Sequence, residues 1–444
     1  MILSEVKPFY SAMQSPASLK ERVVWVLYLG GLFFLLYGAA NEFANATAPH
    51  LSLFGDWEKH IPFIPAFIVP YMSSDIVFVI AFLLPQSRFA LRVLAVRVLF
   101  IVLLSVFVFV IFPLQFSFVK PPVESFTFLF TLLEADKPFN QLPSLHVSFS
   151  IVFWFSMKSA IKNKALTFFL GIWLILIITS TLFVYQHHFI DLPTGLAVGL
   201  FAVVLFGEKR NTYLLNRFMT PRHLKMALYF LLASIILMVL SFKLHFVFIY
   251  PFISVLSVSI IYAFGLNDFL LSKSGQVNKL NRVLFAPYFL GCKLSWGMYK
   301  RSLPLFAKVD DQLYFGRQPS VEEYSKISEL GLKHVINLAS ELQFNQSAVV
   351  QQRVNFLDQT MQDPVALHQV VLQIEANKRD GVYVHCALGL SRSILVIWAW
   401  MIFNGKKNDE IINYFTRVRP RFVQSQYMRI NINLYCDYLA NQTH

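Results

Sequence analysis

Long apolar segments dominate the first 270 residues of the chain. A helix needs roughly 20 apolar residues to cross the hydrocarbon core of a bilayer, and eight runs approach or reach that length. They cover residues 23–40, 62–84, 93–116, 144–157, 165–186, 188–206, 226–242 and 245–266, of which the fourth is short. The first run is followed by seven others and has no clear cleavage pattern, so it is interpreted as an anchor. The pattern predicts a polytopic all-α membrane domain over residues 1–266.

The pattern changes after Leu266. Residues 267–308 mix basic with aromatic side chains, which predicts a linker lying on the membrane surface. From residue 309 to 444, short apolar runs predict three strands and two helices. The strands are Gln312–Phe315, His334–Asn337 and Val382–Val384, and the helices are Val321–Leu330 and Ile394–Phe403. Strands that alternate with helices favour a soluble α/β domain.

Composition agrees with a chain that lies largely in lipid. Of 444 residues, 56% are hydrophobic and 14% are charged, whereas soluble domains carry about 25% charged residues. The composition therefore argues against an ordinary water-soluble enzyme. Three cysteines, Cys292, Cys386 and Cys436, are too few for a disulfide framework. The net charge of +13 fits either nucleic-acid binding or the cytoplasmic loops of a membrane protein.

The placement of lysine and arginine decides between these two explanations, because positive residues stay on the cytoplasmic side. One set of alternate loops holds thirteen: Lys7, Lys20, Arg22, Arg88, Arg92, Lys158, Lys162, Lys164, Lys209, Arg210, Arg217, Arg222 and Lys225. The other set holds four: Lys59, Lys120, Lys137 and Lys243. Both termini are predicted to be cytoplasmic, and we expect membrane lipids rather than nucleic acid as partners.

The strongest local motif is His-Cys-Ala-Leu-Gly-Leu-Ser-Arg-Ser at residues 385–393. It places Cys386 and Arg392 in a loop between a buried strand and a helix. Main-chain N–H groups of such a loop bind an oxyanion, and Arg392 can bind it with two hydrogen bonds. The same positive field favours the Cys386 thiolate, which is the nucleophilic form. Ser393 is placed to hydrogen-bond the sulfur when it leaves.

This motif resembles the signature of the dual-specificity branch of the protein tyrosine phosphatase superfamily. The resemblance covers about residues 305–435, from Leu313-Tyr-Phe-Gly-Arg-Gln-Pro319 to Arg419-Pro420. It implies the Cys-dependent phosphatase fold and a phosphocysteine intermediate, with no metal or cofactor. It also implies that Gly389 and Ser391 belong to the substrate-binding loop.

In that family an aspartate on an upstream loop protonates the leaving oxygen and then activates water. Asp358 occupies this place in the sequence and is the predicted general acid, with Asp363 as the alternative. Cys292 and Cys436 lack a comparable setting and are interpreted as packing residues. Cys292, near the membrane, is also a candidate for acylation.

Two polar clusters stand out near the ends of predicted spans, where ionisable residues are functional candidates. They are Pro143-Ser144-Leu145-His146 and the stretch from Ser180 to Asp191. His187 and Asp191 are four residues apart, so on a helix the carboxylate can orient the imidazole. A pair of histidines can transfer a phosphoryl group without metal, because one attacks phosphorus while the other protonates the departing oxygen. Both clusters are predicted on the non-cytoplasmic side.

Residues 60–206 resemble the type 2 phosphatidic acid phosphatase superfamily, and are closest to its inositol phosphorylceramide synthase-like branch. The resemblance implies His187 as nucleophile, Asp191 as its orienting group, His146 as general acid and Ser144 as a phosphate ligand.

Two positions depart from the phosphatase pattern. Thr181 stands where the phosphatases have arginine, and the synthase-like branch also lacks that arginine. The first basic motif is not visible, and the nearest basic-proline steps are at Lys120 and Lys137. His188 is interpreted as a neighbour of the site. A metal site from His187, His188 and Asp191 is disfavoured because adjacent helical residues do not face one ligand sphere.

The whole chain resembles bacterial fusions of these two modules, which predicts a multi-pass protein of the bacterial inner membrane. Three hypotheses follow. The first is a lipid phosphatase with a cytoplasmic cysteine site and a second histidine site, hydrolytic or transferring, on the opposite face. The second is a protein phosphatase that acts on phosphotyrosine, phosphoserine or phosphothreonine and is anchored by an inactive membrane domain. The third is a non-catalytic binder of phosphorylated partners. The oligomeric state stays open.

Overall fold

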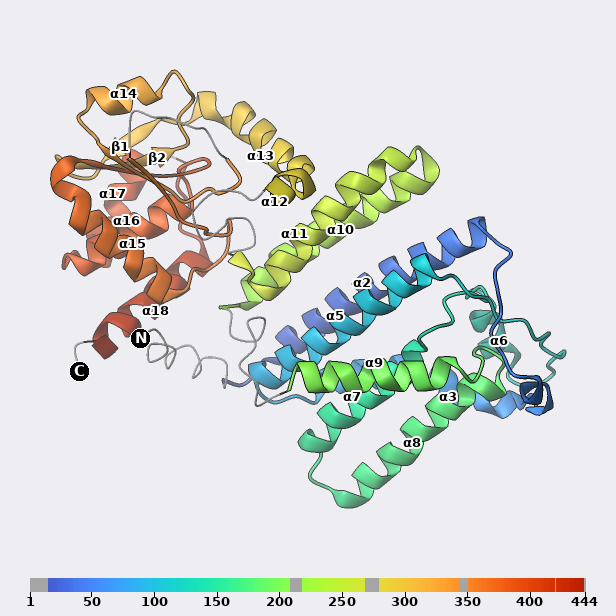
Figure 1. Ribbon diagram of the computed structural model, residues 1–444. Helices are drawn as coiled ribbons and strands as arrows, with labels where there is room; N and C mark the ends of the chain where they lie inside the picture. Colours follow the sequence, from blue (N-terminus) through green and yellow to red (C-terminus); the bar gives the residue numbers. More distant parts are fainter. Residues whose placement is uncertain (1–14, 208–217, 268–278, 343–349, 420, 443–444) are drawn as a thin grey trace. The chain divides into compact units, whose positions relative to one another are not determined.

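The computed structural model describes residues 15–207, 218–267, 279–342, 350–419 and 421–442 (Figure 1). By its internal contacts the chain divides into two compact units, Met1–Asn216 and Arg217–His444. The last two apolar helices thus group with the C-terminal domain, whereas the sequence-based division ended the membrane domain at residue 266. The predicted cytoplasmic N-terminus lies outside the described residues.

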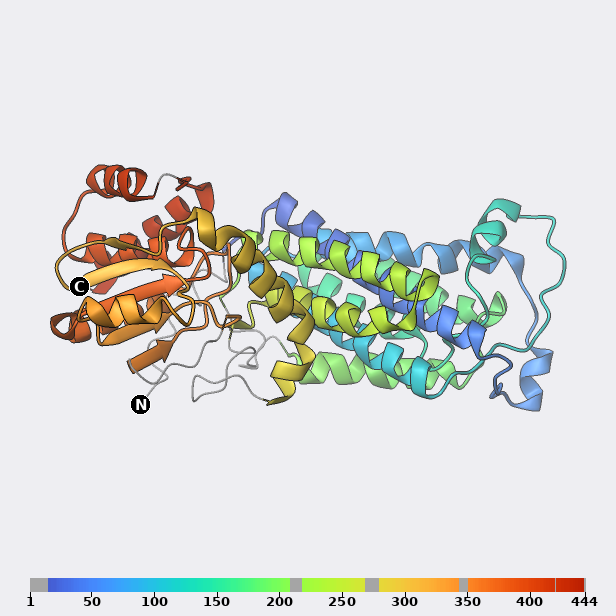
Figure 2. The ribbon, with the colours of Figure 1, turned by 90° about the horizontal axis from the view of Figure 1, so that it is seen from above.

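The N-terminal unit is helical. Its longer helices are α2 (Leu19–Ala46), α4 (Ser74–Leu83), α5 (Arg88–Ile111), α7 (Leu145–Ala160), α8 (Lys164–Phe183) and α9 (Asp191–Leu205). Short helical segments join them: η1 (Asp56–His60), η2 (Pro65–Phe67), α3 (Ile68–Met72) and α6 (Thr127–Leu133). Helices α2 and α5 lie side by side, and α7 packs against α9 (Figure 2).

Small residues bring α7 and α9 together. A Cβ atom added at Gly195 would lie 2.5 Å from the Ser144 carbonyl oxygen, and one at Gly199 would lie 2.8 Å from the Ser148 carbonyl oxygen. The Ser148 hydroxyl donates to the Gly195 carbonyl at 2.9 Å, and the Ser148 side chain is buried. Close backbone approach at small residues is typical of helix pairs in membranes. This contact brings the start of α7 next to the start of α9.

Within the described residues, six helical segments are long and apolar enough to cross a membrane. They are Leu19–Ala46, Pro65–Leu83, Arg88–Ile111, Lys164–Phe183, Pro221–Lys243 and Phe246–Phe264. The fourth and sixth predicted spans correspond to α7 and α9, which have 16 and 15 residues. Both are shorter than the roughly 20 residues that a perpendicular span requires. Membrane association is supported, and the number of eight spans stays a prediction.

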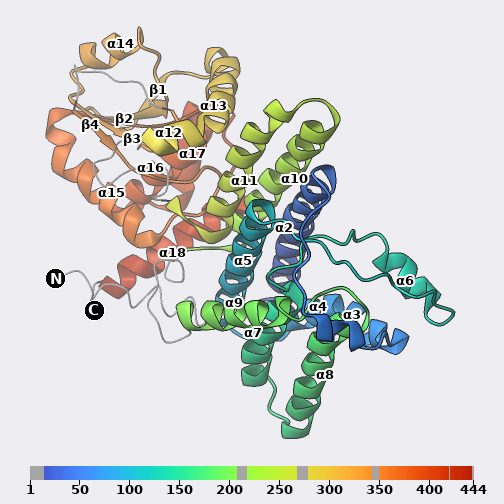
Figure 3. The ribbon, with the colours of Figure 1, turned by 45° about the vertical axis from the view of Figure 1, so that its right-hand side comes forward.

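The C-terminal unit begins with a helical hairpin. Helix α10 (Pro221–Lys243) and helix α11 (Ile249–Phe264) are joined through η3 (Phe246–Phe248) and pack along each other (Figure 3). Part of the predicted linker, residues 268–278, lies outside the described residues. The rest forms α12 (Lys279–Leu284), α13 (Ala286–Tyr299) and η5 (Lys300–Ser302), and α13 packs against α11.

A five-stranded sheet forms the centre of the remaining domain. The strand order is β1-β2-β5-β3-β4, in which β1 pairs antiparallel with β2 and the other neighbours are parallel. The strands are β1 (Phe306–Lys308), β2 (Leu313–Arg317), β3 (His334–Asn337), β4 (Val350–Arg353) and β5 (Val382–Cys386). The helices are α14 (Tyr324–Glu329), α15 (Pro364–Asn377), η6 (Lys378–Asp380), α16 (Arg392–Phe403), α17 (Asn408–Val418) and α18 (Gln426–Gln442).

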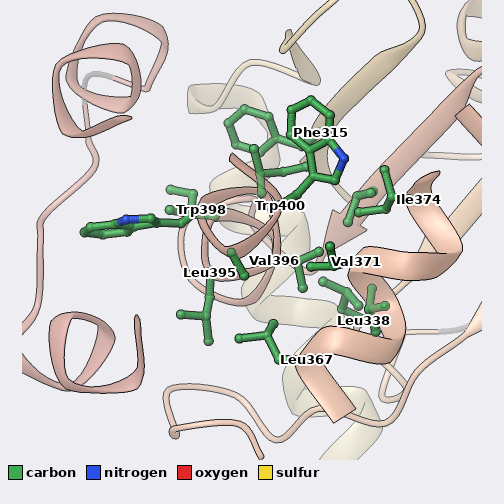
Figure 4. Packing of buried hydrophobic residues seen from close by; sticks show 14 of the residues in the cluster. Phe315, Leu338, Leu367, Val371, Ile374, Leu395, Val396, Trp398 and Trp400 are labelled. Atoms are coloured by element: carbon green, nitrogen blue, oxygen red, sulfur yellow. The ribbon is translucent and has the colours of Figure 1, made fainter. Parts of the chain in front are cut away.

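Alternation of side chains along the strands sorts them onto two faces, as the period of two requires. Val335 and Tyr383 pack against α14 in a small cluster on one face. Ile336 and Val384 belong to the larger core, which contains the buried side of α16 (Figure 4). Ten of the residues of α16 are buried, from Arg392 to Met401. The helix that follows the cysteine loop is therefore fixed in the centre of the domain.

The predicted mixed α/β fold of the C-terminal region is confirmed. The predicted strand His334–Asn337 is β3, and the predicted strand Val382–Val384 falls within β5. The predicted strand Gln312–Phe315 overlaps β2, which begins and ends later, at Leu313 and Arg317. The predicted helix Val321–Leu330 is shorter, at Tyr324–Glu329, since residues 321–323 form a turn. Strands β1 and β4 were missed. Strand β4 is polar and lies at the sheet edge, so it has no buried face to produce an apolar pattern.

Candidate active sites

The loop of residues 386–391 leaves β5 at the carboxyl end of the parallel strands and leads into α16. Gly389 has φ of +72°, and a Cβ atom there would lie 2.7 Å from the main-chain carbon of Gly316. Only glycine satisfies both the left-handed backbone and this close approach to β2. The loop therefore turns sharply at Gly389, whose N–H is directed at Cys386.

Cys386 lies at the bottom of this loop, with 2% of its side chain exposed. Its Sγ accepts the N–H of Gly389 at 3.3 Å and lies 3.4 Å from the Ser393 hydroxyl. Burial lowers the pKa of the adjacent His385 to about 3, so this imidazole is neutral. The Gly389 N–H and the Ser393 hydroxyl, rather than an imidazolium charge, thus face the sulfur.

Arg392 is the first residue of α16 and is buried. Its Nη1 donates to the main-chain carbonyls of Leu338 and Phe356, both at 3.0 Å. Glu341 binds the guanidinium with both carboxylate oxygens, at 3.0 and 2.5 Å. Sequence reasoning missed Glu341, which lies far upstream of the motif. These acceptors fix the plane of the guanidinium beside Cys386.

Asp358 and Asp363, the two candidates for the general acid, have different surroundings. The Oδ1 of Asp358 lies 3.2 Å from Nε of Arg392, and its side chain is 41% exposed. Asp363 caps α15, where its Oδ1 accepts the N–H of Val365 at 3.0 Å. Burial raises the pKa of Asp363. Of the two, Asp358 is thus the carboxylate that contacts both the arginine and solvent.

Comparison with known proteins agrees with this geometry. Residues 313–435 match the family model described as the catalytic domain of dual specificity phosphatases. The C-terminal unit contains a dual specificity phosphatase domain. A domain of this family implies hydrolysis of phosphoric monoesters. No curated protein matches the chain.

Solved structures similar to the phosphatase domain cover about a third of the chain. Tk-PTP in its active form is 24% identical over 30% of this chain and 96% of its own, with a TM-score of 0.28. PTPMT1 in complex with PI(5)P is 18% identical over 32% and 100%, with a TM-score of 0.29. TpbA from P. aeruginosa is 19% identical over 29% and 81%, with a TM-score of 0.25. The family assignment of this domain therefore rests on the match of residues 313–435 to the family model and not on these structures.

Helix α18 contacts the end of the loop of residues 386–391, which we call the phosphate loop. The Ser391 hydroxyl lies 2.8 Å from the hydroxyl of Tyr427, which comes from α18. Ser391 was predicted as part of the substrate-binding loop, and Tyr427 was missed. The sequence offers no local signal for Tyr427, because α18 follows the motif by more than thirty residues and meets it only in the folded domain.

The N-terminal unit brings its predicted site residues together. Nδ1 of His187 lies 3.1 Å from Oδ2 of Asp191, and the same oxygen accepts the N–H of His188 at 3.0 Å. The rings of His146 and His187 are 6.2 Å apart between centroids, and Ser144 is buried at the start of α7. Two imidazoles and one carboxylate thus converge, in an arrangement that can attack phosphorus and protonate a leaving group.

His188 faces a different set of partners. It is stacked between Phe54 and Phe116, with ring centroids at 5.0 and 4.4 Å, and its Nδ1 lies 3.4 Å from a carboxylate oxygen of Glu58. These contacts agree with a packing role. No cluster of three or more His, Cys, Asp or Glu side chains suited to a metal occurs in the part of the chain that the structure describes.

Proposed function

We propose that this protein is a membrane-bound phosphatase that hydrolyses phosphomonoesters of lipid head groups at Cys386. The chemistry is supported by the loop of the buried Cys386, which leads directly into Arg392, and by the Asp358 carboxylate, which lies 3.2 Å from Nε of Arg392. Sγ of Cys386 attacks phosphorus and forms the S–P bond, while the P–O bond to the substrate breaks. Asp358 gives its proton to the departing oxygen, and Arg392 neutralises the non-bridging oxygens.

The second half of the reaction regenerates the enzyme. The Asp358 carboxylate takes a proton from water, whose oxygen attacks phosphorus. The S–P bond breaks, inorganic phosphate leaves, and the electron pair returns to sulfur. The Ser393 hydroxyl, 3.4 Å from Sγ, stabilises this thiolate. The cycle needs no redox partner, since the only other reactant is water.

Preference for a lipid substrate is supported by the surface of α13. Leu290, Leu294 and Met298 are 59%, 60% and 75% exposed, and their spacing of four residues places them on one helix face. Lys293 and Lys300 accompany this apolar row. Apolar side chains with flanking lysines are typical of helices that lie on anionic lipid. A site held at such a surface meets lipid head groups at high local concentration.

The test uses the purified full-length protein in nanodiscs. Release of phosphate is measured from phospholipids with a terminal phosphomonoester and from phosphopeptides, for the wild type and for Cys386→Ser. We expect Cys386-dependent release from the lipids. Retention of all activity in Cys386→Ser would refute the assigned nucleophile. Cys386-dependent activity on phosphopeptides alone would favour an anchored protein phosphatase, and binding of phosphopeptides without turnover would favour a non-catalytic module.

A second function is supported by the pair of His187 and Asp191. We propose that the N-terminal unit is a lipid phosphatase or head-group phosphotransferase, in which His187 attacks phosphorus, His146 protonates the leaving oxygen and Ser144 binds phosphate. Labelled phosphate trapped on His187, and lost in His187→Ala, is the expected result. If labelled lipid is turned over and the N-terminal unit carries no label, this unit acts only as an anchor.

We propose a bacterial inner-membrane location with both termini cytoplasmic and the two sites on opposite faces. Reporter enzymes fused after Lys120 and after Lys308 test this topology. We expect opposite sides for the two fusions. The same side for both would refute the eight-span arrangement.

A further inference from the structure

The loop that carries Asp358 is bound by the helical hairpin that precedes the phosphatase domain. The hydroxyl of Tyr262, near the end of α11, donates to the main-chain carbonyl of Asp358 at 3.3 Å. Arg222, near the start of α10, donates from Nε to the carbonyl of Gln359 at 2.9 Å and from Nη2 to its side-chain oxygen at 3.3 Å. Both helices of the hairpin thus contact the same two residues.

These hydrogen bonds act on a strained turn. Gln359 has φ of +53°, a left-handed conformation that is unfavourable for a residue with a side chain. A strained backbone persists only where its surroundings hold it. Arg222 binds both the main chain and the side chain of Gln359. It therefore holds the turn that sets the direction of the Asp358 side chain.

Arg222 is also linked to the phosphate loop, through the side chain of Tyr427. Its guanidinium lies over the ring of Tyr427, 4.8 Å from the centroid, and the Tyr427 hydroxyl lies 2.8 Å from that of Ser391. One side chain of α10 is thus connected to the acid loop on one side and to the loop of Cys386 on the other. Arg222 thus links the two loops, as does the ion pair between Arg392 and Asp358.

We propose that Tyr262 and Arg222 are positioning residues of the phosphatase, so that the α10–α11 hairpin completes the catalytic site by holding Asp358 toward Arg392. This inference rests on the proposed function. Neither residue exchanges a proton with the substrate. Their effect passes through Asp358 and therefore concerns the departing oxygen rather than the phosphate oxygens.

This role predicts a dependence on the leaving group. An aryl phosphate with an acidic phenol departs without much protonation, whereas an alkyl phosphate such as a glycerol phosphate head group needs the proton of Asp358. Displacing Asp358 should slow the alkyl substrate far more than the aryl one. A variant that merely unfolds part of the domain would slow both substrates equally.

The experiment compares Tyr262→Phe and Arg222→Gln with the wild type in nanodiscs, using an acidic aryl phosphate and a short-chain phosphatidylglycerophosphate. Tyr262→Phe loses one neutral hydrogen bond, so kcat on the lipid should fall about fivefold. Arg222→Gln loses charge-assisted bonds, and a fall of about 10- to 100-fold is expected. For both variants kcat on the aryl phosphate should change less than about twofold.

The matched control is Tyr250→Phe. Tyr250 also lies on α11 and donates its hydroxyl to a main-chain carbonyl, that of Val283, away from the acid loop. It should leave the ratio of the two kcat values unchanged. Equal loss on both substrates, or an unchanged ratio in Tyr262→Phe and Arg222→Gln, would overturn the inference while Cys386-dependent activity of the wild type stands. Absence of that activity in the wild type would instead overturn the proposed function.

Discussion

Replacing Glu341 by glutamine should disable phosphate binding by Arg392. In the wild type, both Glu341 oxygens accept hydrogen bonds from the guanidinium, whose side chain is 1% exposed while that of Glu341 is 7% exposed. The substitution turns one acceptor into an NH₂ group that faces a donor. It also leaves a buried charge with less compensation.

The expected cost follows from the other partners of Arg392. Breaking one side of a buried ion pair costs about 3–5 kcal/mol. The carbonyls of Leu338 and Phe356 still accept from Nη1, so we expect the lower end, about 3 kcal/mol. If this cost falls on the orientation of Arg392, kcat/KM drops roughly 100-fold, since about 1.4 kcal/mol corresponds to a factor of ten.

The assay is phosphate release from the aryl and the alkyl phosphomonoester described above, together with thermal unfolding. Because the proposed role of Arg392 is to bind the non-bridging oxygens that every phosphomonoester shares, both substrates should lose kcat/KM to the same extent. The unfolding midpoint should also fall, by less than the roughly 6–12 °C that the full 3 kcal/mol would give at about 2–4 °C per kcal/mol for a unit of this size.

Glu323→Gln is the matched control. Glu323 binds Arg317 with two hydrogen bonds, at 2.8 and 2.6 Å, and so copies the geometry of the Glu341 pair. The main chain of Arg317 is paired with that of Cys386 in the sheet, but its guanidinium donates to Glu323 and to the carbonyls of Leu303 and Gln318. It should lower the midpoint and leave kcat/KM close to that of the wild type. The reasoning is refuted if Glu341→Gln behaves in the same way as this control, with stability lost and kcat/KM retained.

Three further predictions follow from other contacts. Hydrogen bonding to Arg317 lowers the pKa of Glu323 to about 2. The stability advantage of the wild type over Glu323→Gln should therefore be complete above about pH 4.3 and disappear as the pH falls toward about 2. A difference in unfolding midpoint that does not vary with pH would contradict this. Gly389→Ala should reduce kcat/KM at least about tenfold, because its Cβ would collide with the main chain of Gly316, and unaltered kinetics would show that the loop relaxes freely. Gly195→Ala should destabilise the N-terminal unit by about 1–3 kcal/mol in denaturant titrations, whereas Gly38→Ala, which has open space, should not; equal effects would exclude close packing as the cause.

The sequence was most informative where the chemistry is local. The loop from Cys386 to Arg392 lies between a strand and a helix whose apolar patterns are strong, so both elements and the loop between them could be predicted. Asp358 and Asp363 are five residues apart in an irregular segment without periodicity, so pattern alone could not separate them. The structure distinguishes their surroundings through contacts with Arg392 and with the start of α15.

Other parts of the site arise only from tertiary structure. Glu341 meets Arg392 across 51 residues, and Tyr262 meets Asp358 across 96 residues. Neither pair leaves a spacing that helical or strand periodicity would reveal. Hydropathy assigned α10 and α11 to the membrane domain because their side chains are apolar. That measure does not register the few polar groups at the helix ends that bind the phosphatase domain.

Strand β1 limits where the catalytic domain can be separated from the rest of the chain. It pairs with β2 and covers one edge of the sheet, and the nearby Pro304 carbonyl accepts a hydrogen bond from Arg419. A fragment that begins at residue 309, where the composition becomes that of a soluble protein, would leave the edge of β2 open. Open edges recruit strands from other molecules and cause aggregation. A fragment intended for crystallisation should therefore begin upstream of Phe306.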